Sequence, residues 1–171
     1  MFQLIAVIFS MLADGRAAVA QPVDACALLA SADIQAVLGE AVNERKPGTE
    51  TAGKLLTSHC FFGTSSAKSV SLTLTRTNAS SRSGLTPREY WHRQFHPADH
   101  DEDHDGRARP IPGVGEEAYW TGNRFAGALY VLRGDAFLRI SVGGIRDEQT
   151  RIANSKTLAL AVLKHLDGRE G

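Results

Sequence analysis

Residues 69–76 constrain the fold more than any other part of the chain. Their sequence, SVSLTLTR, alternates hydroxyl-bearing and apolar side chains. Successive side chains of a β-strand point to opposite faces of the sheet, so the two kinds of side chain are separated onto two faces. The apolar set is Val70, Leu72 and Leu74, and the hydroxyl set is Ser71, Thr73 and Thr75. The pattern predicts a strand of a sheet that has one buried face and one face in water.

Other segments carry weaker strand signals. Strands are predicted from Cys60 onward, over 117–121, over 128–133 and over 136–142, the last two joined by a tight turn at Gly134-Asp135. Residues 43–58 are polar and contain two glycines and a proline, so they are predicted to form a loop or an irregular pair of strands.

Three helices are predicted from spacing and end signals. The first follows Asp24 and ends at Gly39, and the second begins at a capping box formed by Thr86 and Glu89 and ends near His96. The third spans 147–166. The order of elements predicts an α+β fold: an antiparallel sheet of about five to six strands with helices packed on one face. It also suggests two helix-plus-meander halves followed by a C-terminal helix.

The first twenty residues predict export. Phe2 to Leu12 is an almost uninterrupted apolar run, and small residues follow it up to Ala18-Val19-Ala20. A short apolar run that ends in an Ala-x-Ala site is typical of a secretory signal peptide and is too short to cross about 30 Å of hydrocarbon. We therefore expect residues 1–20 to be a signal peptide and 21–171 to be a single domain, located in the periplasm or outside the cell. No membrane anchor is expected after signal cleavage.

The chain has two cysteines, Cys26 and Cys60, and both follow the predicted signal peptide. A pair of cysteines in an oxidising compartment predicts a disulfide. Closing a loop of roughly 35 residues stabilises a fold by about 3–4 kcal/mol on the chain-entropy estimate. Lipidation of Cys26 is not expected, because the preceding Val23-Asp24-Ala25 lacks the pattern of a lipidation site.

The overall charge excludes one class of partner. The chain carries 19 basic and 19 acidic side chains. Nucleic-acid-binding domains usually carry a basic surplus or a basic stripe, so we do not expect a nucleic-acid partner.

Two stretches carry a family resemblance. One is the run from Cys26 to Gly39, CALLASADIQAVLG, followed by a second cysteine and two phenylalanines before an alternating strand; the other is Gly113 to Trp120, GVGEEAYW. Together they resemble a group of small exported bacterial proteins of unknown function, many of them actinobacterial lipoproteins. The resemblance implies an exported α+β domain with a disulfide, and it supplies no catalytic residues. The chain departs from the group in lacking the lipidation pattern.

Four of the six histidines recur at four-residue spacing among several acidic residues. Imidazole and carboxylate groups are ligands for zinc, copper and nickel, and histidines four apart on a helix share a face. The candidate ligands are His92, His96, Asp99, His100, Asp103 and His104. A solvated acidic loop that binds no specific metal is the competing interpretation.

A second candidate site is aromatic. Tyr90, Trp91, Tyr119 and Trp120 are predicted to lie on a helix and a strand, where they would line a ligand pocket or form part of the core. No nucleophile motif of the Gly-x-Ser-x-Gly type is present, and a disulfide would consume both cysteines, so we expect no enzymatic activity. The leading hypothesis is a non-enzymatic binding or interaction domain for a protein or a small-molecule ligand, with 97–115 as a recognition segment. The alternative is a metal-binding or metal-buffering protein.

Overall fold

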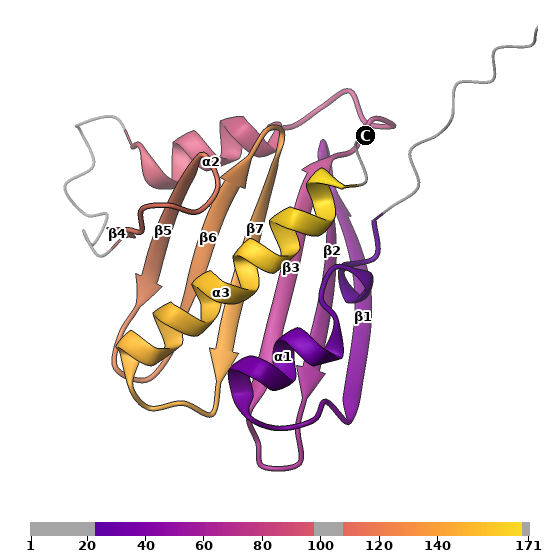
Figure 1. Ribbon diagram of the computed structural model, residues 1–171. Helices are drawn as coiled ribbons and strands as arrows, with labels where there is room; N and C mark the ends of the chain where they lie inside the picture. Colours follow the sequence, from indigo (N-terminus) through magenta and orange to yellow (C-terminus); the bar gives the residue numbers. More distant parts are fainter. Residues whose placement is uncertain (1–22, 98–107, 169–171) are drawn as a thin grey trace, which may run out of the picture.

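The computed structural model describes residues 23–97 and 108–168 (Figure 1). The first half contains a short 3₁₀-helix, a helix and three strands: η1 (Ala25–Ala27), α1 (Ser31–Leu38), β1 (Glu44–Ala52), β2 (Leu55–Gly63) and β3 (Ser69–Thr77). The second half contains α2 (Pro87–Phe95), β4 (Arg109–Pro110), β5 (Glu117–Gly122), β6 (Gly127–Arg133) and β7 (Ala136–Gly143). The C-terminal helix is α3 (Glu148–Asp167).

The strands form one antiparallel sheet in the order β1-β2-β3-β7-β6-β5-β4. The first meander is β1-β2-β3, the second is β5-β6-β7, and the pairing of β3 with β7 joins them at the centre of the sheet. A helix precedes each meander and α3 follows the second one, as the predicted order of halves requires. The α+β class with an antiparallel sheet is therefore confirmed.

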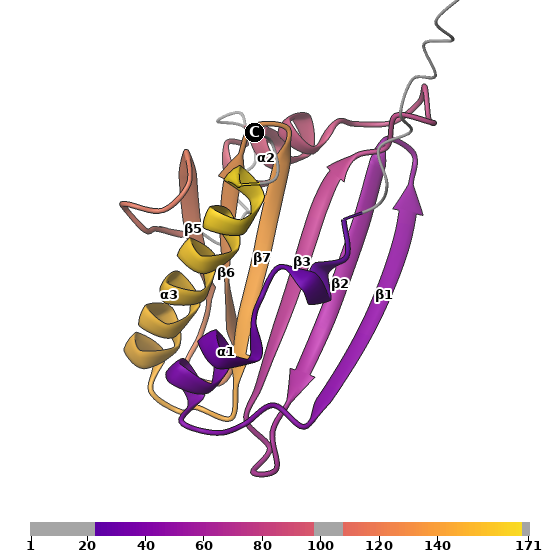
Figure 2. The same ribbon diagram turned by 45° about the vertical axis from the view of Figure 1, so that its right-hand side comes forward.

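One face of the sheet, here called the inner face, is covered by η1, α1 and α3 (Figures 1 and 2). It carries Val70, Leu72 and Leu74 of β3, which are buried together with apolar residues of the helices. Side chains of α3 such as Leu158 and Val162 are fully buried there. The alternation in β3 predicted this face, and the predicted layer of helices on it is confirmed.

The opposite face, here called the outer face, is covered at one end by α2. Trp91 of α2 packs against Leu132 of β6 and Phe137 of β7 in a small second core, to which Phe95 also contributes. This core is separate from the one under α1 and α3. Within the described ranges, the helices thus divide between the two faces, with α2 alone on the outer one.

The sheet contains more strands than the sequence predicts. Strand β1 pairs with β2 along its whole length, so residues 43–58 form most of a regular hairpin. Eight of the nine residues of β1 are exposed, because it lies at the edge of the sheet. An edge strand that buries neither face has no reason to alternate in hydropathy, which explains its weak sequence signal. The two-residue β4 adds the remaining strand.

The predicted disulfide joins Cys26 of η1 to Cys60 of β2, with the two Cα atoms 5.1 Å apart. Beside it, the amide of Ala25 donates a hydrogen bond of 3.0 Å to the buried hydroxyl of Ser58. The covalent bond and the hydrogen bond together hold η1 against the inner face. None of the helices that the structure describes has the length and apolar character needed to cross a bilayer.

Candidate functional site

Helix α2 begins where the sequence places it. The Thr86 hydroxyl accepts a hydrogen bond from the amide of Glu89, and the Glu89 carboxylate accepts one of 2.7 Å from the amide of Thr86. The bond from the Thr86 amide, and then one of 2.9 Å that the Thr86 hydroxyl donates to the same carboxylate, hold the pKa of Glu89 below its usual value. Pro87 stands at the first helical position, where its missing N–H costs nothing. The capping box therefore fixes the direction in which α2 crosses the outer face.

The carboxylate of Glu117 on β5 anchors the C-terminal part of α2. It accepts a hydrogen bond of 3.1 Å from the indole Nε1 of Trp91, and it lies 2.7 Å from Nε2 of His96. The hydrogen bond with His96, and then that with Trp91, lowers the pKa of Glu117. Because Trp91 is fully buried, this carboxylate supplies an acceptor that its indole N–H cannot obtain from water.

The neighbouring carboxylate, Glu116, anchors the other end of the helix. It accepts hydrogen bonds from the Gly134 amide at 2.6 Å and from Arg88 of α2 at 2.7 Å, and these bonds lower its pKa, the one from Gly134 most of all. Gly115 precedes Glu116 in the turn that leads into β5. Its φ is +62°, and an added Cβ would lie 2.4 Å from Cγ1 of Val131, so this turn requires glycine. Two adjacent carboxylates thus hold α2 at both ends.

The six predicted metal ligands divide into two groups. His92 and His96 lie one turn apart on α2, with ring centroids 5.4 Å apart. Asp99, His100, Asp103 and His104 lie outside the described residues. Within the described ranges, no three His, Cys, Asp or Glu side chains come together as metal ligands. Glu117, the carboxylate that contacts His96, also accepts the hydrogen bond from Trp91.

The four predicted pocket aromatics do not share one site. Trp91 and Tyr119 lie 6.0 Å apart on the outer face, and Tyr90 stacks at 5.6 Å on Phe137 of the same face. Trp120 lies in the core of the inner face instead, where its Nε1 donates a hydrogen bond of 3.0 Å to Glu148. The cause is the alternation of side chains along β5, which sends Tyr119 and Trp120 to opposite faces.

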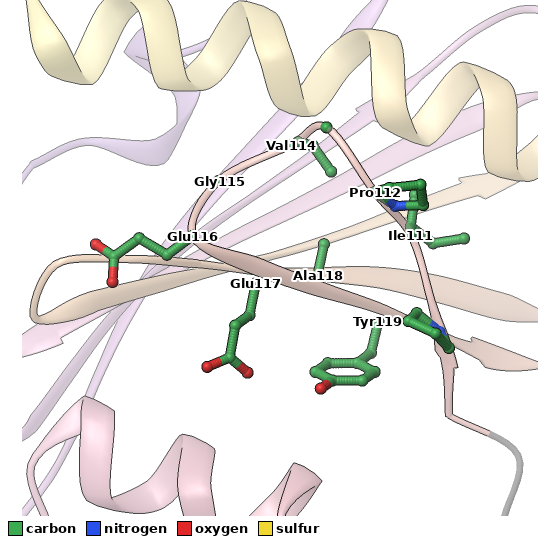
Figure 3. A pocket seen from close by; sticks show the side chains of 10 residues that line it. Ile111, Pro112, Val114, Gly115, Glu116, Glu117, Ala118 and Tyr119 are labelled. Atoms are coloured by element: carbon green, nitrogen blue, oxygen red, sulfur yellow. The ribbon is translucent and has the colours of Figure 1, made fainter.

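A hollow of about 420 Å³ lies along residues 110–119 (Figure 3). Its lining consists of β4, the loop 111–116 and the first half of β5. In Figure 3 the side chains of Glu117 and Tyr119 point away from α3, toward the side on which α2 lies. The carboxylates that border the hollow, Glu116 and Glu117, are occupied in holding α2. Few polar groups thus remain here to orient a ligand.

Beyond α2, the outer face presents a row of side chains in register across the sheet. The row runs from β2 to β5 and consists of His59, Thr73, Arg139, Tyr130 and Tyr119, each paired with the next by the strand register. Tyr119 and Tyr130 lie beneath Phe95 of α2, at ring-centroid distances of 4.8 and 5.4 Å. The His59–Thr73–Arg139 end of the row extends past the helix. All five side chains are partly exposed.

Arg139 lies near the middle of this row, on the central strand of the sheet. Its Nε donates a hydrogen bond of 3.2 Å to the hydroxyl of Tyr130, and its guanidinium carbon lies 5.8 Å from the centroid of the same ring. In the part of the chain that the structure describes, Arg139 forms no ion pair and its two terminal nitrogens donate to no protein acceptor. The outer face therefore holds a positioned cation whose terminal nitrogens have no partner among residues 23–97 and 108–168.

Sequence reasoning missed Arg139 because a single arginine in a strand resembles any solvent-exposed residue. The signal that was available is its place in the alternation AFLRISV, where it shares a face with Phe137 and Ser141. That alternation shows which face the residue occupies. Its partner Tyr130 follows from the tight turn between β6 and β7, and its partner Thr73 follows only from the register of β3 with β7.

Comparisons with protein-family models, with curated proteins and with solved structures find no match to this chain.

Proposed function

We propose that this protein is an exported, non-enzymatic binding domain and that its binding surface is the outer face of the sheet. The observation that carries the proposal is the row centred on Arg139, in which a positioned guanidinium and the neighbouring Thr73 hydroxyl are partly exposed on the outer face. Antiparallel sheets that serve only as scaffolds commonly present polar residues to water on one face. A partly exposed arginine with unused donors adds a recognition element to such a face.

Export is part of the proposal. It is supported by the predicted signal peptide at 1–20 and by the Cys26–Cys60 disulfide, since disulfides persist in oxidising compartments such as the periplasm and the extracellular space. The non-enzymatic character is supported by the role of Glu117, the described carboxylate that contacts His96. Glu117 and His96 act together to dock α2, which is a structural task.

The proposal is tested by titrating the ¹⁵N-labelled protein with a defined panel of probes and following its amide signals. The panel contains capped peptides of alternating Glu and Ser, Gln and Ser, or Lys and Ser, together with maltohexaose. At least one probe is expected to shift outer-face amides of β2, β3 and β7 and to be recovered chemically intact. Shifts confined to α1 and α3, no shifts with any probe, or cleavage of a probe would contradict the proposal.

Metal binding is the second candidate function. It is favoured by the proximity of His92 and His96 on one face of α2 and by the spacing of His100 and His104 beyond the described helix. Calorimetric titration with Zn²⁺, Cu²⁺ and Ni²⁺ tests it, alongside a variant with alanine at all four histidines. Submicromolar, one-to-one binding that disappears in the variant would establish the metal site. Weak or histidine-independent binding would exclude it.

A further inference from the structure

We infer that the outer face binds a protein partner through a carboxylate that pairs with Arg139. This inference rests on the proposed function and adds the chemistry of the ligand. Arg139 is a planar donor whose Nε is already used by Tyr130, so the two terminal nitrogens remain to bind an acceptor. Guanidinium groups bind carboxylates through parallel N–H donors, and this pairing is stronger than a hydrogen bond between neutral groups.

The surroundings of Arg139 favour an anionic partner group. Its neighbours in the row are the Thr73 hydroxyl and the Tyr130 phenol, neither of which carries a charge near neutral pH. Of the other outer-face carboxylates, Glu117 is bound to His96 and Trp91, Glu44 pairs with Lys46, and Glu50 lies on the edge strand β1, separated from β7 by β2 and β3. The aromatic ring behind the guanidinium holds it in one orientation, which lowers the entropy cost of binding.

The breadth of the face favours a macromolecule over a small ligand. Strands lie about 4.8 Å apart and rise about 3.3 Å per residue, so β1, β2, β3 and β7 present a face of roughly 19 by 30 Å, on the order of 600 Å². This area is smaller than the roughly 800 Å² that each partner of a standard-size interface contributes, and it matches a transient protein interface, which buries less than about 1,200 Å² in total. Small molecules bind mainly in concave pockets, and the hollow along 110–119 lies at the β4 end of the sheet.

The position of Arg139 disfavours a second copy of this chain as the partner. A two-fold interface places the same patch of each copy against the other. Because Arg139 is on the central strand, pairing two outer faces about that strand would bring two guanidinium groups together. Their repulsion would weaken the dimer, whereas an acidic residue of a different protein would neutralise the charge.

The inference is tested with the peptide of alternating Glu and Ser as the probe and the peptides of Gln and Ser or Lys and Ser as references. Binding is followed by the outer-face amides and by the Nε–H signal of Arg139, which reports directly on its guanidinium. Arg139→Gln should weaken binding of the acidic peptide at least tenfold. The control Arg124→Gln removes another arginine that lies over an aromatic ring, Phe125, outside the row, and it should leave the affinity unchanged.

A second variant keeps the test informative if Arg139→Gln alters folding. Tyr130→Phe leaves the aromatic ring and removes the acceptor of Arg139 Nε, so it should weaken binding several-fold with little change in melting temperature. Equal binding of the three peptides to the outer face, or binding that both variants leave intact, would overturn the inference but not the proposed function. If none of the probes binds to the outer face, both the inference and the proposed function are overturned. Dimerisation through the outer face, measured by sedimentation, would also overturn the inference.

Discussion

The docking of α2 on the outer face gives a prediction whose size follows from the structure. Trp91 is fully buried, and its indole N–H donates to the Glu117 carboxylate at 3.1 Å. Glu117→Met keeps the approximate volume of the side chain but removes the acceptor. A buried donor left without a partner costs about 1–3 kcal/mol, and losing the exposed pair with His96 costs about 0–1 kcal/mol. We therefore expect the substitution to lower the free energy of unfolding by about 1–4 kcal/mol.

A double-mutant cycle isolates the part of that loss due to the indole. In Trp91→Phe the donor is absent, so Glu117→Met should then cost only the pair with His96, about 0–1 kcal/mol. The coupling between the two positions should be about 1–3 kcal/mol, which is within the range measured for residues in direct contact. Chemical denaturation of the parent, the two single variants and the double variant measures it. Strictly additive losses would refute the claim that Glu117 anchors α2 through Trp91.

Three further predictions concern other parts of the fold. Hydrogen bonds from Ser66 and Lys68 lower the pKa of Glu40 to about 2, so its contribution to stability is complete above pH 5 and is lost as the pH falls from about 4.5 toward 2. The difference in unfolding free energy between the parent and Glu40→Gln should shrink over that range, and a pH-independent difference would contradict the assignment. Replacing both Cys26 and Cys60 by alanine should lower the free energy of unfolding by about 3–4 kcal/mol, which corresponds to about 10 °C in melting temperature. An unchanged melting temperature under oxidising conditions would show that the disulfide does not stabilise the fold. Gly115→Ala should lower the free energy of unfolding by more than about 2 kcal/mol, because an added Cβ would overlap Cγ1 of Val131. Gly134 also has a positive φ but has open space around it, so Gly134→Ala should lower it by about 1 kcal/mol. Thermal denaturation compares the pair, and equal costs would show that the close contact at Gly115 is unimportant.

The local sequence predicted those elements that bury one face or carry explicit end signals. Strand β3 alternates because the inner face is buried beneath it, and α2 begins at Thr86 because its capping box satisfies the first amides of the helix. Gly39 ends α1 with a φ of +74°, as expected for a C-terminal glycine. In each case the determining interactions are local, and a single sequence records them.

The sequence did not reveal features that depend on which elements meet in space. Strand β1 is polar on both sides because it is an edge strand, so its pattern resembles that of a loop. Nothing in the sequence of α2 indicates whether it packs on the inner or the outer face. The pairing of Thr73 with Arg139 depends on the register between β3 and β7, which are far apart in the chain, whereas the pairing of Arg139 with Tyr130 follows from the short turn between β6 and β7.

The four aromatic residues of the predicted pocket divide between the two faces of the sheet. Trp91 and Tyr119 of the predicted aromatic set lie together on the outer face. Trp120, the fourth member of the set, lies in the core of the inner face, because adjacent residues of a strand face opposite sides. The candidate site is therefore the row across the outer face, to which Tyr119 of the aromatic set belongs.

The most direct test of the outer face as a binding surface is to place a carboxylate next to Arg139. Thr73 is paired with Arg139 across β3 and β7, so Thr73→Glu would neutralise the guanidinium from within the chain. The matched control is Thr157→Glu, at an exposed position of α3 on the other side of the sheet. The quantity to measure is the affinity of each variant for the peptide of alternating Glu and Ser. We predict that Thr73→Glu abolishes binding while Thr157→Glu retains it; binding unaffected by Thr73→Glu, or weakened equally by both substitutions, would contradict the account.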